Sequence, residues 1–180
     1  MSKSLIPKII KKDGAFIIAE IGKNFIQTEA SQSTKVYLKN AKKLIDAAAK
    51  AGAHAVKFQT HEVEDEQANI PVVSPHFKGA DRYNWVKRNT EEAPLSFFKE
   101  LKEYAKKKGI IFFSTPMSRK AAVKLDSIGV PFWKVGSGDV QDHVLLDYIT
   151  KTKKPIIIAN GMVSHTERDE VVEYITKRGA

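Results

Sequence analysis

The chain alternates between short apolar runs and longer segments in which apolar residues recur every three or four positions. The first kind of segment is typical of buried strands, and the second is typical of amphipathic helices. Strands are predicted at residues 15–20, 54–60, 110–115, 132–137 and 155–160. Helices are predicted at residues 36–51, 94–108, 119–128, 144–150 and 167–177. This alternation indicates an α/β protein, in which helices cover both faces of a parallel sheet.

One connection is much longer than the others. Residues 61–92 are mostly polar and include Pro71, Pro75 and Gly79, so we expect an extended polar loop of the kind that often forms a functional lid. The segment begins with His61, and four acidic residues follow within five positions. That cluster suggests either a metal site or a solvated acidic loop, and we favour the solvated loop.

Five strand–helix units suit two architectures. One is a complete open sheet of the doubly wound type, and the other is a (β/α)8 barrel represented by its first five units. A full barrel takes about 250 residues, whereas this chain has 180. The hydrophobic pattern alone therefore favours the open sheet.

Composition narrows the class of protein only slightly. The residues are 42% hydrophobic and 28% charged, which is ordinary for a globular domain. No stretch approaches the roughly 18 apolar residues of a membrane span, and the first residues lack the apolar core of a signal peptide. We therefore expect a cytoplasmic protein with no membrane partner. The absence of cysteine excludes disulfides, thiolate metal sites and cysteine nucleophiles.

The formal charge of +9 suits either a nucleic-acid partner or an anionic small substrate. The lysines are spread along predicted helices, as at Lys39, Lys42 and Lys43, instead of being interleaved with aromatic residues. This spacing is typical of a solvated helix face and differs from a nucleic-acid-binding surface. We expect no nucleic-acid partner.

Polar side chains interrupt the apolar runs where the predicted strands end. Lys57 and Lys134 each interrupt a strand, and burying an unpaired ammonium group is costly. Each lysine therefore either pairs with a nearby carboxylate such as Glu20 or binds a phosphate or carboxylate of a ligand. Thr115 and Ser137 also lie at strand ends and offer hydroxyl groups. We favour an anion site, because both architectures place ligands at the carboxyl ends of parallel strands.

The segment Val135-Gly136-Ser137-Gly138 supports an anion site beside Lys134. Glycine lets backbone amides approach an anion closely. The segment lacks the third glycine of a dinucleotide fingerprint, and the chain contains neither a P-loop nor a GxSxG nucleophile elbow. The sequence therefore does not indicate a dinucleotide site, a P-loop site or an α/β-hydrolase site.

Five short motifs occur in order at the predicted strand ends. They are Ile18-Ala19-Glu20-Ile21-Gly22 followed by Asn24, Lys57-Phe58-Gln59-Thr60, Phe113-Ser114-Thr115-Pro116, Lys134-Val135-Gly136-Ser137-Gly138-Asp139 and Lys154-Pro155-Ile156-Ile157-Ile158-Ala159-Asn160-Gly161-Met162. Together they resemble the sialic acid synthase family, whose members make N-acetylneuraminate and related nonulosonates. The resemblance begins near Ala15 and covers the rest of the chain.

The resemblance reverses the choice of architecture. Family members have a (β/α)8 barrel followed by a small antifreeze-like domain. Residues 1–180 are then the N-terminal portion of that barrel, a TIM barrel with about five of its eight units present. On this interpretation the chain is a fragment that lacks the later strands and the antifreeze-like domain, and it is inactive alone. The alternative is a non-catalytic half-barrel, or a small open-sheet protein, that binds a phosphorylated ligand.

The resemblance also implies a reaction. The family condenses phosphoenolpyruvate with an N-acylated hexosamine, such as N-acetylmannosamine, and releases phosphate. Lys57, Thr115, Lys134 and Ser137 match family positions that bind phosphoenolpyruvate. Glu20 matches the carboxylate near the attacking water and is the candidate catalytic residue.

The same match makes Gln59 a sugar-contacting residue. A divalent cation, Mn or Mg, is implied as a Lewis acid, but the family's two metal-binding histidines lie on later strands, so no residue here is assigned to the metal. The chain departs from the family at Phe25, where a histidine is common, and at Ala159, where a serine is common. Unpaired strand edges also predict a homo-oligomer. These residues do not identify the N-acyl sugar.

Overall fold

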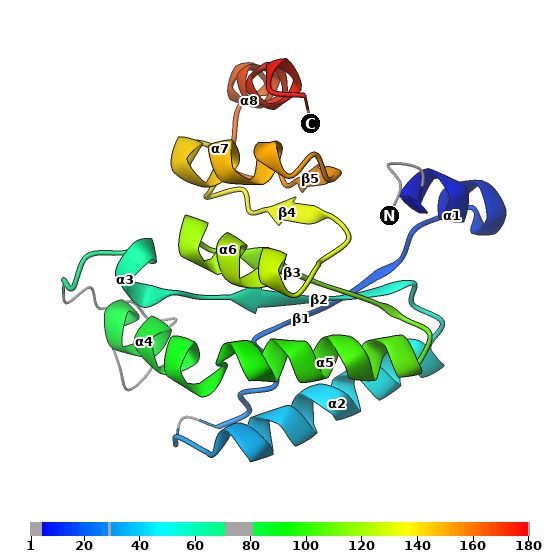
Figure 1. The fold of residues 1–180 in the computed structure, drawn as a ribbon, viewed down its shortest axis with the longest axis vertical. Coiled ribbons are helices and arrows are strands. Elements are labelled where there is room, and N and C mark those ends of the chain that lie inside the picture. Colours follow the sequence, from blue (N-terminus) through cyan, green and yellow to red (C-terminus); the bar gives the residue numbers. More distant parts are fainter. Residues whose placement is uncertain (1–4, 29, 71–80, 180) are drawn as a thin grey trace.

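The computed structural model describes residues 5–28, 30–70 and 81–179, and these form an α/β structure with parallel strands (Figure 1). The strands are β1 (Ile18–Gly22), β2 (Ala55–Thr60), β3 (Ile111–Pro116), β4 (Trp133–Val135) and β5 (Ile156–Ile158). The helices are α1 (Leu5–Asp13), α2 (Thr34–Lys50), α3 (Val63–Glu66), α4 (Arg82–Glu92), α5 (Leu95–Lys107), α6 (Arg119–Ser127), α7 (His143–Lys151) and α8 (His165–Lys177). The predicted α/β class and all five predicted strands are confirmed.

The strands follow one another in chain order. β1, β2 and β3 form one parallel sheet, β4 and β5 form a second, and β4 lies beside β3. A doubly wound sheet reverses its strand order at a switch point, and neither sheet in the described part of the chain contains such a reversal. The open doubly wound sheet that the hydrophobic pattern favoured is therefore wrong. The described strands do not close into a barrel.

Apart from α1, the described helices that pack on the strands cover one face of them and bury their apolar stripe there, so the expectation that helices cover both faces of the sheet is wrong. α2 and α5 lie side by side along β1, β2 and β3, whereas α6 packs on β3 and α7, and α8 packs on α7 (Figure 1). On α2 the buried residues Tyr37, Ala41 and Ile45 are four positions apart, which places them on one side of the helix. Phe58 of β2 and Trp133 of β4 belong to the same hydrophobic core.

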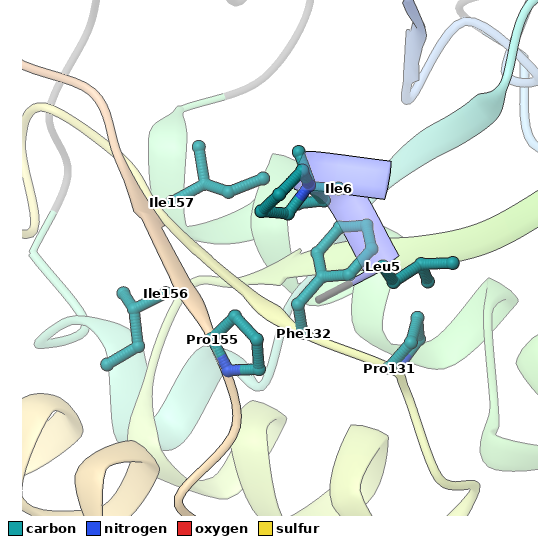
Figure 2. A pocket seen from close by; sticks show the side chains of 8 residues that line it. Leu5, Ile6, Pro131, Phe132, Pro155, Ile156 and Ile157 are labelled. Carbon is teal, nitrogen blue, oxygen red and sulfur yellow. The ribbon is translucent and has the colours of Figure 1, made fainter. Parts of the chain in front are cut away.

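The opposite face of the strands is apolar near the strand starts and polar two residues further along each strand. Near the strand starts, Ala55, Phe113 and Phe132 form a second apolar cluster that packs against Leu5 and Ile6 of α1. Figure 2 shows these two α1 residues beside Phe132 at an apolar pocket bounded by the starts of β4 and β5. Side chains of a strand alternate between its faces, so the positions two residues later lie on this same face. Those positions are Lys57, Thr115 and Lys134.

The polar segment after β2 is partly helical. It contains α3 and α4, so the prediction of an extended loop over residues 61–92 is wrong for its described part. Asp81 accepts a hydrogen bond from the backbone N–H of Asn84 at 2.8 Å and thereby caps the start of α4. Pro71, Pro75 and Gly79 lie outside the described residues. In residues 5–28, 30–70 and 81–179, no helix combines the length and the apolar character that crossing a bilayer requires.

Candidate functional site

Lys57 lies in the middle of β2 and contacts both neighbouring strands. Its Nζ forms an ion pair with the Glu20 carboxylate of β1 and donates a hydrogen bond to Thr115 Oγ1 of β3 at 3.3 Å. The strand register explains this convergence, because Glu20 lies opposite Lys57 and Gln59 lies opposite Thr115. Parallel pairing therefore brings together four of the six predicted site residues, namely Glu20, Lys57, Gln59 and Thr115.

The two members of the ion pair differ in their environment. The Glu20 side chain is 52% exposed, whereas that of Lys57 is 11% exposed. Gly22 makes room for Glu20 at a β-bulge, since its backbone has a φ of 54° and a Cβ there would lie 3.3 Å from Glu20 Oε1. That Cβ would also lie 3.9 Å from Gln59 Cδ, which places Gln59 beside Glu20 and Gly22.

Lys134, on β4, has no such carboxylate partner among the described residues. Its Nζ donates a hydrogen bond to the backbone carbonyl of Val135 at 2.6 Å. Burial lowers the pKa of Lys134, and the charge of Lys57 lowers it further, whereas Glu20 and Asp139 act in the opposite direction. Two ammonium groups therefore lie close enough to repel each other, and an anion between them would relieve this repulsion.

The sequence left two alternatives for each lysine: an ion pair with a nearby carboxylate, or binding of an anionic ligand. Lys57 and Lys134 differ in this respect. Lys57 pairs with Glu20, as in the first alternative. Lys134 is half-buried and retains only a neutral partner in the described structure, which leaves its charge available to a ligand. Ser137 is partly buried in the loop after β4, and no described hydrogen bond links it to Lys57 or Thr115.

Asp139 is a further acidic residue of the site that the sequence did not single out. It lies in the loop after β4, where its backbone N–H donates to the Gly136 carbonyl at 3.1 Å. A Cβ on Gly136 would lie 2.5 Å from Asp139 Oδ2, so the glycine is what lets the carboxylate fold over the loop. Asp139 Oδ2 is buried and has no hydrogen-bond partner within the described residues. Burial, followed by the charges of Glu66 and Asp142, raises the pKa of Asp139.

His61 and Glu66 form a buried pair next to this site. His61 Nδ1 lies 2.6 Å from Glu66 Oε2, and the two side chains are only 4% and 5% exposed. The edge of the His61 ring packs against Trp85 of α4, and burial lowers the pKa of His61. The interpretation of this segment as a solvated acidic loop is therefore wrong for His61 and Glu66. A packed helix covers them.

Lys23 also belongs to this region and was missed at the sequence level. Its Nζ lies 3.4 Å from the centroid of the Trp85 ring, a favourable position for a cation. Burial lowers the pKa of Lys23 to about 8, although the charge of Glu66 opposes this shift. No spacing rule indicates this contact, because Lys23 follows a strand and Trp85 lies on a distant helix.

The described residues do not fit a divalent cation. Within those residues, no group of three or more His, Cys, Asp or Glu side chains is arranged to hold a metal ion. We assign no metal ligand. The chemistry that the arrangement does support is recognition of a small anion, because Lys57 and the Thr115 hydroxyl are hydrogen-bonded on the same strand face as Lys134, whose pKa the charge of Lys57 lowers.

Comparison with known proteins gives consistent matches. The NeuB family matches residues 44–180. N-acetylneuraminate-9-phosphate synthase of Mus musculus is 32% identical over 169 residues, which are 91% of this chain and 44% of the mouse protein. N,N'-diacetyllegionaminic acid synthase of Campylobacter jejuni is 32% identical over 167 residues, covering 88% of this chain and 48% of that protein.

A solved structure agrees with these matches. The N-acetylneuraminic acid (sialic acid) synthetase of Leptospira borgpetersenii serovar Hardjo-bovis, determined in complex with citrate, superposes with a TM-score of 0.74. The two sequences are 30% identical, and the superposition covers 92% of this chain and 51% of that one. The chain thus spans about half of the length of the proteins that it matches.

Proposed function

Because the chain belongs to the NeuB family, we propose that it carries the phosphoenolpyruvate-binding part of a sialic acid-type synthase. In the proposed reaction, the methylene carbon of phosphoenolpyruvate attacks the aldehyde carbon of an N-acyl hexosamine. Water adds to the resulting cationic carbon, and phosphate leaves with cleavage of its C–O bond. The product is a nonulosonate, and the enzyme is a transferase that forms a carbon–carbon bond.

The main observation behind this proposal is that Lys57 of β2 and Lys134 of β4 lie on the same face of the strands. Phosphoenolpyruvate has a phosphate and a carboxylate separated by a short carbon unit, so its recognition requires two cationic groups close together. The two lysines lie on the same face of the strands, and the charge of Lys57 lowers the pKa of Lys134. Thr115 adds a hydroxyl donor beside Lys57, and Ser137 adds a second hydroxyl in the loop after β4.

Two other residues are assigned to the attacking water and to the sugar. Glu20 is half-exposed in the middle of β1, just before the bulge at Gly22, and its carboxylate would orient the attacking water and accept its proton. Gln59 lies beside Glu20 and Gly22, and its amide would contact the sugar. These two assignments rest on the family positions and on the shared location with Lys57.

We also propose that residues 1–180 correspond to the first five units of a (β/α)8 barrel. The consecutive strand order supports this, because barrel strands neighbour one another in chain order. The two strand faces support it as well, since a barrel places one face against the helices and the other inside, with polar residues at the carboxyl ends.

The test is calorimetric titration of the chain with phosphoenolpyruvate. Lys134→Ala removes a charge-assisted contact and should weaken binding roughly 10- to 150-fold. Lys107→Ala, an exposed lysine near the end of α5, removes the same charge far from the site and should bind like the parent. If Lys134→Ala also binds like the parent, or the parent does not bind, the proposed anion site is wrong.

A further inference from the structure

The ion pair between Glu20 and Lys57 joins two residues that the proposed function assigns to different tasks. Lys57 is nearly buried and is also bonded to Thr115, so its position is fixed from two sides. Glu20 is half-exposed and has no second described hydrogen bond. Glu20 is therefore the member of the pair that has room to move away.

An incoming anion would compete with Glu20 for the same ammonium group. Lys57 has three N–H donors, and the described structure directs one toward Thr115 and one toward Glu20. A phosphate or carboxylate that also contacts Lys134 must approach Lys57 on the side of β4. Two anionic groups on one ammonium repel each other, which favours departure of the more exposed one.

We propose that Glu20 is a displaceable counterion: the anionic group of phosphoenolpyruvate replaces it on Lys57, and the released carboxylate becomes free to hold the water. The inference rests on the proposed function, from which it takes the substrate and the water. Its consequence is an ordered site, in which the carboxylate that handles water is released only once the anion is bound.

Binding measurements on Glu20→Gln test the exchange. Removing a competing carboxylate should raise the affinity for phosphoenolpyruvate, whereas removing a substrate contact would lower it. We expect Glu20→Gln to bind phosphoenolpyruvate about two- to fivefold more tightly than the parent, the range that a half-exposed ion pair can supply. Glu100→Gln is the matched control. Glu100 is 51% exposed and pairs with Lys42 at 2.5 Å on the helical side, so its removal changes the net charge equally and should leave the affinity unchanged.

A double-mutant cycle shows whether the gain acts through Lys57. Lys57→Gln should weaken binding, and adding Glu20→Gln to it should give no gain. Glu20→Asp, which withdraws the carboxylate by one methylene, provides a second variant and should also bind more tightly. If the parent binds but neither Glu20 variant binds more tightly, the counterion inference is wrong and the anion site stands. If the parent and every variant fail to bind, both the inference and the proposed function are wrong.

Discussion

Substitution of Gly136 by alanine tests how the loop after β4 is packed. The new Cβ would lie 2.5 Å from Asp139 Oδ2, a separation that requires one of the two groups to move. Gly136 does not have a positive φ, so alanine is compatible with its backbone and the cost comes from the carboxylate. Gly138 lies two residues away, and a Cβ there would meet only Met162 Cε at 3.5 Å, an ordinary contact.

The expected magnitude follows from two opposing effects. Overpacking a buried position costs about 1–3 kcal/mol. Replacing glycine by alanine at a compatible position stabilises by about 0.4–1 kcal/mol through the unfolded chain. Gly136→Ala should therefore lower the free energy of unfolding by about 0–2.6 kcal/mol, and Gly138→Ala should leave it unchanged or raise it by up to about 1 kcal/mol.

Urea denaturation of the parent and both variants measures these differences. In the background of Asp139→Ala the clash is absent, so Gly136→Ala should no longer destabilise. If Gly136→Ala and Gly138→Ala have equal effects, or the loss persists with Asp139→Ala, the carboxylate does not lie over Gly136 as described.

Three further predictions follow from other parts of the molecule. Folding lowers the pKa of Lys23 from 10.5 to about 8. Between these two pH values the unfolded chain binds more protons than the folded chain, so the stability of the parent should rise relative to that of Lys23→Met as the pH increases from about 8 to 10.5. A stability difference that stays constant across this pH range in urea titrations would contradict the prediction. Glu66→Gln should lower the free energy of unfolding by about 1–3 kcal/mol, because it weakens the buried hydrogen bond to His61. Glu64 is exposed, so Glu64→Gln should change the free energy of unfolding by under about 0.5 kcal/mol. Equal effects of the two substitutions in urea denaturation would show that the His61–Glu66 pair is not buried. Light scattering should detect a dimer or larger species, because β1 and β5 each keep one unpaired edge in the described structure, and a stable monomer would contradict this.

The sequence predicted the parts of the site that depend on strand register. Glu20, Lys57 and Thr115 each lie near the end of an apolar run, and parallel pairing places such ends together whatever the details of the packing. It did not predict the burial of His61 and Glu66. α3 has four residues, too few to show a helical period, and the covering ring of Trp85 comes from α4.

The missed helices have similar explanations. α4 buries little apolar surface, with Val86 as its one buried apolar residue, so its pattern resembles that of a polar loop. The capping residue Asp81 was the available signal for its start. α1 has no fully buried residue and packs by its Leu5 and Ile6 on strands much later in the chain. Contacts of that kind are not encoded in a local window.

The position of α1 has a consequence for how the chain is made. Leu5 and Ile6 are synthesised well before Phe132 and Ile157, the residues beside which they pack. Such long-range contacts form slowly because closing a long loop costs entropy. We therefore expect the first helix of the nascent chain to stay exposed, with its apolar side available to chaperones, until the fourth and fifth strands emerge and bury it.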